Sequence, residues 1–119
     1  MKVLESEITK KDDQYYPLNV DEVMACFRSR WQVTYDLQLI KRNKCLYIQI
    51  MWGYLEQKSF PLDEEEYILH LNNVLEVINR IGSANQVREW LFNTPRKPRI
   101  GRAISLPLRS GEGLEEYLL

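Results

Sequence analysis

The stretch that most constrains the fold is CLYIQIMWGYLEQKSFP, which runs from Cys45 to Pro61. Side chains from Leu46 to Trp52 alternate between the two faces of a strand, and both faces are apolar except at Gln49. A strand that is apolar on both faces is typical of the middle of a sheet, where each face has something packed on it. We therefore predict that residues 45–52 form the central strand.

The second half of this stretch is apolar where a loop is expected to be polar. After Gly53 the alternation stops, but aromatic and aliphatic side chains continue. One interpretation is that the loop folds back and closes the core. The other is that it exposes aromatic side chains to a partner protein, because Trp and Tyr are favoured anchors at interfaces. The partner-binding candidates in this loop are Trp52, Tyr54, Leu55, Gln57 and Phe60.

Capping residues followed by apolar stripes at helical spacing indicate two helices. Asn19 is the predicted cap of a helix over Val20–Arg30, and Asp63 that of a longer one over Glu64–Ile81. Gly82 is expected to end the second helix in a left-handed conformation. Both helices have one apolar stripe, so each is expected to pack on a sheet.

Alternating segments indicate two further strands, over Val33–Ile40 and Ala103–Leu108. The polar residues Lys41–Lys44 form the turn of a hairpin between the first and the central strand, with Asn43 at positive φ. Pro107 has no backbone donor, which places the last strand at a sheet edge. The predicted fold is α+β, with element order α-β-β-α-α-β and helices on one face of a small three-stranded antiparallel sheet.

A short third helix, for which Ser83 and Gln86 predict a capping box, leads into a basic loop. No acidic residue lies between Glu89 and Glu112, and prolines keep the loop extended. The loop is either a solvated surface, a site for an acidic protein, or a site for nucleic-acid phosphates. Nucleic acid is the least favoured, because the loop lacks aromatic residues that could stack on bases. Its basic residues are Arg96, Lys97, Arg99, Arg102 and Arg109.

Length and composition bound the organisation of the chain. A sequence of 119 residues that is 45% hydrophobic can bury one core, and its net charge of −1 argues against a protein built mainly to hold nucleic acid. We predict a mobile N-terminal arm over residues 1–17 and a single compact domain over residues 18–119. The chain lacks the roughly 20 consecutive apolar residues of a spanning helix and the pattern of a targeting segment. We therefore expect a cytoplasmic protein without membrane insertion, a monomer or weak dimer.

No pattern indicates catalysis. Two cysteines, Cys26 and Cys45, and the single His70 cannot supply a four-ligand zinc site, and the cysteines are expected to be free. His70 is expected to make a local hydrogen bond at the margin of its helix rather than to act as a general base. The acidic run Asp63–Glu66 is explained by its place in a first helical turn. We predict no catalytic residue, no cofactor and no metal.

The runs IQIMWGYLEQKSFPLDEEEY and RKPRIGRAISLPL resemble the signature stretches of a cyanobacterial and plastid family, domain of unknown function 3067. The resemblance extends from about Leu18 to the C-terminus. It implies a compact α+β fold unlike the common superfolds and a cyanobacterial cytoplasmic source, but no activity. A link to photosynthetic physiology is implied only by where such proteins occur.

The function that these observations favour is a non-catalytic protein-binding module, an accessory or assembly factor in an oxygenic phototroph. The alternatives are a nucleic-acid-associated protein that uses the Arg96–Arg102 loop, and an enzyme of unrecognised type. If the last strand is antiparallel to the central one, Ala103 begins near the end that carries Trp52. The aromatic and basic loops would then form one surface, unless Arg99 or Arg102 pairs with Glu56 and only fastens the loop.

Overall fold

The structure is a computed structural model, and it describes residues 16–108. Its elements are α2 (Val20–Trp31), β1 (Tyr35–Arg42), β2 (Cys45–Tyr54), α3 (Glu64–Arg80), α4 (Ala84–Asn93) and β3 (Ile104–Pro107). The predicted α-β-β-α-α-β order is confirmed. The predicted arm lies outside the described residues except at Tyr16 and Pro17, and so does the tail after Leu108.

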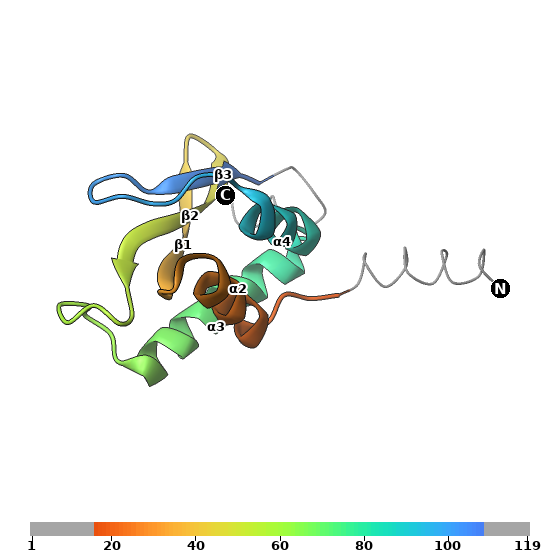
Figure 1. Cartoon of the computed structure of the whole chain (residues 1–119). Coiled ribbons are helices and arrows are strands. Elements are labelled where there is room, and N and C mark those ends of the chain that lie inside the picture. The colour runs from red at the N-terminus through yellow and green to blue at the C-terminus, as the bar shows by residue number, and fades with distance from the viewer. Residues whose placement is uncertain (1–15, 109–119) are drawn as a thin grey trace.

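The sheet has the order β1-β2-β3 and both pairings are antiparallel, so β2 is the central strand (Figure 1). Ile48 of β2 pairs with Leu39 on one side and with Leu106 on the other. Pro107 lies in the edge strand β3, where its lack of a backbone N–H does not remove a hydrogen bond from the sheet. The prediction of a central strand flanked by two antiparallel neighbours is confirmed.

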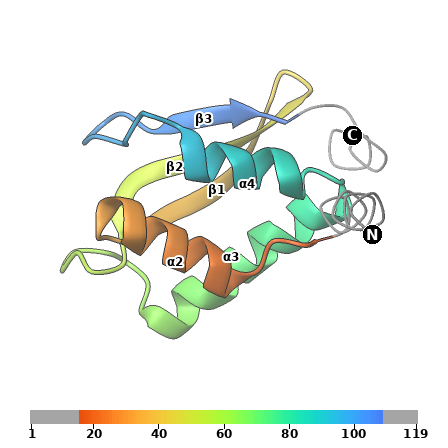
Figure 2. The same cartoon turned by 45° about the vertical axis from the view of Figure 1, so that its right-hand side comes forward.

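Helices α2, α3 and α4 cover one face of the sheet, and the core lies between the two layers (Figure 2). Leu37 and Ile48 contribute from the sheet and Leu71 from α3, and all three are fully buried. The Asn19 carboxamide accepts a hydrogen bond from the backbone N–H of Glu22, 2.8 Å away, and so caps α2 as predicted. Asp63 caps α3 in the predicted capping box, and Gly82 follows that helix with φ of 78°.

The strand β1 begins two residues later and ends two residues later than predicted. Gln32 takes φ of 63° at the end of α2, so the chain is still turning where a strand was expected from Val33. At the other end only Asn43 and Lys44 form the turn, both with positive φ. A two-residue hairpin turn of this type needs positive φ at both positions, which leaves the residues before it free to pair.

The ends of β2, α4 and β3 also differ from the prediction. β2 continues beyond Trp52 to Tyr54, past an irregularity in its pairing with β1. β3 is shorter than predicted, from Ile104 to Pro107. The predicted capping box at α4 is wrong: Ser83 has φ −104° and ψ 11°, not the extended backbone of a cap, and makes no side-chain cap bond. Gln86 instead donates a hydrogen bond to the carbonyl oxygen of Pro107, 3.0 Å away.

Candidate binding site at the basic hairpin

The segment 95–104, called the basic hairpin below, leads from the end of α4 into β3. Two backbone hydrogen bonds close its tip: Arg99 N donates to Arg102 O over 3.0 Å, and Arg102 N donates to Arg99 O over 2.6 Å. Ile100 and Gly101 form the turn between them, and Gly101 has φ of 79°, where a side chain would be strained. The tip of the hairpin is therefore a closed turn, whereas the sequence predicted an extended loop throughout.

A pocket of about 660 Å³ lies along this hairpin and brings together the basic residues that were predicted as a partner site. Within residues 16–108, none of its four cationic side chains has an acidic partner, and all four belong to exposed residues. A concave surface lined by charge of one sign concentrates the field and attracts groups of the opposite sign. The lining residues are Pro95, Arg96, Lys97, Arg99, Arg102, Ala103 and Ile104.

Ile100, at the tip of the hairpin, is a candidate residue that the sequence analysis missed. Its exposed fraction is 90%, against 62% for Leu69 and 36% for Trp52. The signal in the sequence is an apolar residue directly before a glycine in an otherwise basic loop. Arg109, the other residue of the predicted basic block, lies outside the described residues.

The predicted aromatic loop is partly buried and packs against the core. Trp52 is 36% exposed, whereas Tyr54, Leu55 and Phe60 are half-buried and contact the core residues. The Phe60 ring lies where a side chain at Gly53 would reach it, 3.6 Å from the position of a Cβ atom. The first of the two interpretations, a loop that folds back on the core, therefore describes most of this segment.

Internal bonds hold the same loop in a tight turn. Gln57 N donates to Tyr54 O over 3.0 Å, and the Gln57 side-chain oxygen accepts a hydrogen bond from Tyr54 N over 3.4 Å. Tyr54 also makes an edge contact with Tyr35 of β1, with ring centroids 6.1 Å apart. Gln57 thus supports the turn of the loop from within.

Glu56 fastens the loop to the end of α2 and the start of β1. Its carboxylate accepts hydrogen bonds from the backbone N–H of Thr34 at 2.8 Å and from the Thr34 hydroxyl at 2.7 Å. Burial alone would raise the pKa of Glu56, but the hydrogen bonds from Thr34, with a smaller effect of the Arg28 charge, lower it below the ordinary value. The alternative in which Arg99 or Arg102 pairs with Glu56 is wrong, because Thr34 and Arg28 occupy that carboxylate.

The two loops extend from the same end of the sheet, as Figures 1 and 2 show. Ile104 at the start of β3 pairs with Ile50, two residues before Trp52. The antiparallel pairing of β2 and β3 is the condition under which we expected the aromatic loop and the basic loop to be neighbours. In the part of the chain that the structure describes, however, no hydrogen bond or ion pair joins them, and the end of β2 lies between them.

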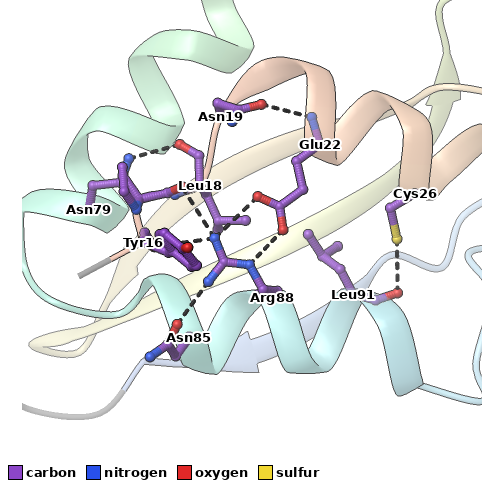
Figure 3. A network of polar contacts seen from close by, with 10 residues as sticks. Tyr16, Leu18, Asn19, Glu22, Cys26, Asn79, Asn85, Arg88 and Leu91 are labelled. Carbon is purple, nitrogen blue, oxygen red and sulfur yellow. Dashed lines mark hydrogen bonds and ion pairs between the residues drawn. The ribbon is translucent and has the colours of Figure 1, made fainter. Parts of the chain in front are cut away.

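A second pocket, of about 690 Å³, lies between the start of α2 and α4, and it differs from the first because its cation, Arg88, is already paired with Glu22. Arg88 on α4 donates to both oxygens of the Glu22 carboxylate, at 2.5 and 3.1 Å, and to the side chain of Asn85 at 2.8 Å. It also donates to the carbonyl oxygens of Tyr16 and Pro17, each at 3.2 Å. Figure 3 shows this network, which ties the leading segment to two helices. Such a site stabilises the fold and offers no free cation.

The side chains best suited to catalysis or metal binding are the histidine and the cysteines, and His70 and Cys26 make contacts within the fold. His70 Nε2 lies 3.0 Å from the carbonyl oxygen of Leu37, which can only accept, so this nitrogen carries the hydrogen and ties α3 to the edge of β1. Cys26 and Cys45 are free, as predicted. Cys26 is buried, and burial raises the pKa of its thiol. Within residues 16–108, no cluster of three His, Cys, Asp or Glu side chains could hold a metal ion.

The sequence profile of domain of unknown function DUF3067 matches residues 21–118. The chain belongs to this family. A solved relative is the solution NMR structure of the Alr2454 protein from Nostoc sp. strain PCC 7120, which is 35% identical. The match has a TM-score of 0.76 and covers 86% of this chain and 98% of the Nostoc protein.

The comparisons confirm the resemblance that the two signature stretches carried, including its cyanobacterial connection. A comparison with curated proteins found no match. Neither the description of the DUF3067 family nor the name of the Nostoc protein states a reaction. No helix in the described range is long and apolar enough to cross a membrane.

Proposed function

We propose that this DUF3067 protein is a non-catalytic binding module that holds an acidic surface of another protein at the basic hairpin. The observation that carries the proposal is the pocket of about 660 Å³ whose four cations have no acidic partner within residues 16–108. Charged side chains are normally paired or spread over a surface, whereas these gather along one concave segment. Electrostatic complementarity of this kind favours fast and selective encounter with an acidic partner.

The groups that an enzyme could use support the same proposal. His70 holds the edge of β1 through Leu37, and the Cys26 thiol donates to the carbonyl oxygen of Leu91, 3.5 Å away. Neither group lines the basic pocket. The pocket offers charge and hydrogen-bond donors, which suit recognition of carboxylates.

An acidic protein suits the hairpin better than nucleic acid does. The chain has a net charge of −1, and the residues from Pro95 to Ile104 include no aromatic side chain that could stack on a base. Four phosphate contacts would give a log–log salt slope of about −3.6 on duplex DNA, so the nucleic-acid alternative has a clear signature. The DUF3067 relative from Nostoc supports a source among oxygenic phototrophs, and a role there as an accessory or assembly factor is part of the proposal.

The test is a titration of the full chain with a fluorescently labelled glutamate-rich peptide. The test variant carries Arg96→Gln, Lys97→Gln, Arg99→Gln and Arg102→Gln. The matched control neutralises four exposed cations elsewhere, with Lys41→Gln, Arg42→Gln, Lys44→Gln and Lys58→Gln. Both variants change the net charge equally, so only a local site distinguishes them.

We expect the peptide to bind the wild type and the control similarly, and the hairpin variant at least about tenfold more weakly, a loss of about 1.4 kcal/mol. If both variants lose the same amount of affinity for the peptide, the interaction depends only on the net charge of the protein, which would contradict the proposal. Tighter binding of duplex DNA than of the peptide, with the salt slope given above, would favour the nucleic-acid alternative.

A further inference from the structure

The tip of the basic hairpin combines an exposed aliphatic side chain with neighbouring cations, and the fold does not require this combination. Ile100 is 90% exposed, and the cations Arg99 and Arg102 flank the two-residue turn that carries it. Gly101, with φ of 79°, supplies the conformation that the turn needs. Ile100 does not have a positive φ. A polar residue at position 100 would therefore leave the backbone of the hairpin unchanged.

An exposed aliphatic side chain on a rigid turn is suited to enter a partner. The two backbone hydrogen bonds between Arg99 and Arg102 hold the turn before binding, which lowers the entropy that a partner must remove. Interfaces commonly place an apolar anchor at the centre and charged residues at the rim. Ile100 with its flanking arginines has this arrangement on a small scale.

We infer that Ile100 is the apolar anchor of the basic hairpin, and that the partner is an acidic protein segment carrying an apolar residue close to its carboxylates. The carboxylates would contact the cations of the pocket, while the apolar residue would cover Ile100. This inference rests on the proposed function and adds to it a criterion of selectivity. Charge attracts any acidic segment, and Ile100 distinguishes those that also present an apolar side chain.

The experiment is a two-by-two comparison with the full chain and two synthetic peptides. Both peptides are rich in glutamate and equal in length and charge, and one has leucines where the other has serines. The protein variants are wild type and Ile100→Ser. Leu69→Ser is the matched control, because Leu69 is also an exposed aliphatic residue, at 62%, but lies on α3 outside the hairpin. Thermal unfolding checks that each variant is folded.

We expect Ile100→Ser to weaken binding of the leucine-containing peptide about tenfold, equivalent to about 1.4 kcal/mol, and to change binding of the serine-containing peptide less than about twofold. Leu69→Ser should bind both peptides as the wild type does. The dependence on salt concentration should be the same for wild type and Ile100→Ser, because no charge is removed.

Three outcomes would overturn the inference in different ways. In the first outcome, Ile100→Ser binds both peptides normally, while the variant with all four hairpin cations replaced binds neither. The proposal of an acidic partner would then hold, and Ile100 would not be its apolar anchor. If neither peptide binds the wild type, the proposed function fails and the inference fails with it. If vesicles with anionic lipid capture the wild type but not Ile100→Ser, and the peptides do not compete, then the tip contacts a membrane surface.

Discussion

Replacing Glu56 with alanine should release the aromatic loop and lower the free energy of unfolding by about 2 kcal/mol. Thr34 is fully buried, and Glu56 accepts hydrogen bonds from both its backbone N–H and its hydroxyl. A buried donor that loses its acceptor costs about 1–3 kcal/mol. The Arg28–Glu56 pair, 4.0 Å apart and about half exposed, should add less than about 1 kcal/mol.

The measurement is urea unfolding followed by tryptophan fluorescence, with Lys58→Ala as control. Lys58 lies in the same loop and is exposed, so its replacement should change the free energy of unfolding by less than about 0.5 kcal/mol. Glu56→Gln keeps one side-chain oxygen as an acceptor and should cost less than Glu56→Ala. If Glu56→Ala costs no more than Lys58→Ala, the loop is not held in the way that the structure indicates.

The same carboxylate predicts a dependence on pH. The pKa of Glu56 is lowered from its ordinary value of 4.5, so the folded state favours the charged form. Stability from this group is therefore fully present above pH 4.5 and is lost as the pH falls through the lower folded pKa. The difference in unfolding free energy between wild type and Glu56→Gln should shrink on acidification. A difference that grows would mean that folding raises the pKa of Glu56 instead of lowering it.

Three further predictions test the core and the cysteines. Ile48→Ala should lower the free energy of unfolding by about 2–5 kcal/mol, because Ile48 is fully buried in the central strand; a urea-measured loss below about 0.5 kcal/mol would contradict the layered core. Tyr67→Phe should lower the free energy of unfolding by about 1–3 kcal/mol in the same assay, because it removes the hydroxyl that donates a 2.7 Å hydrogen bond to the buried carbonyl oxygen of Tyr35 in β1. An unchanged urea midpoint of unfolding would contradict this. Cys45 should react quickly with a thiol reagent and Cys26 only on unfolding, because Cys26 is buried and its thiol pKa is raised; equal rates in the native protein would refute the assignment.

The layered fold was predictable because its signals are local. The alternation of Leu46, Ile48 and Ile50 indicated a strand packed on both sides, and a proline at position 107 indicated the edge. Asn19 and Asp63 cap helices through bonds to residues three positions away, which a sequence shows directly. These features depend on neighbours in the chain, so periodicity and capping patterns were sufficient.

What the sequence could not indicate are contacts between distant segments. Arg88 and Glu22 are 66 positions apart and Thr34 and Glu56 are 22 apart, and no local pattern pairs them. The predicted capping box at Ser83 failed because Gln86 bonds to Pro107 of a later strand. The prominence of Ile100 was missed because an apolar residue in a loop was read as part of a basic run, before the turn at Gly101 was known to expose it.

The measurement that tests the proposed site most directly is an NMR titration of the isotope-labelled full chain with the leucine-containing glutamate-rich peptide. We predict that amide signals of the basic hairpin, from Arg96 to Ala103, shift first and most. Signals of the β1–β2 turn at Asn43 and Lys44, another basic region at the opposite end of the strands, should remain in place. Shifts centred on that turn, or spread evenly over the basic surface, would contradict the assignment of the hairpin as the binding site.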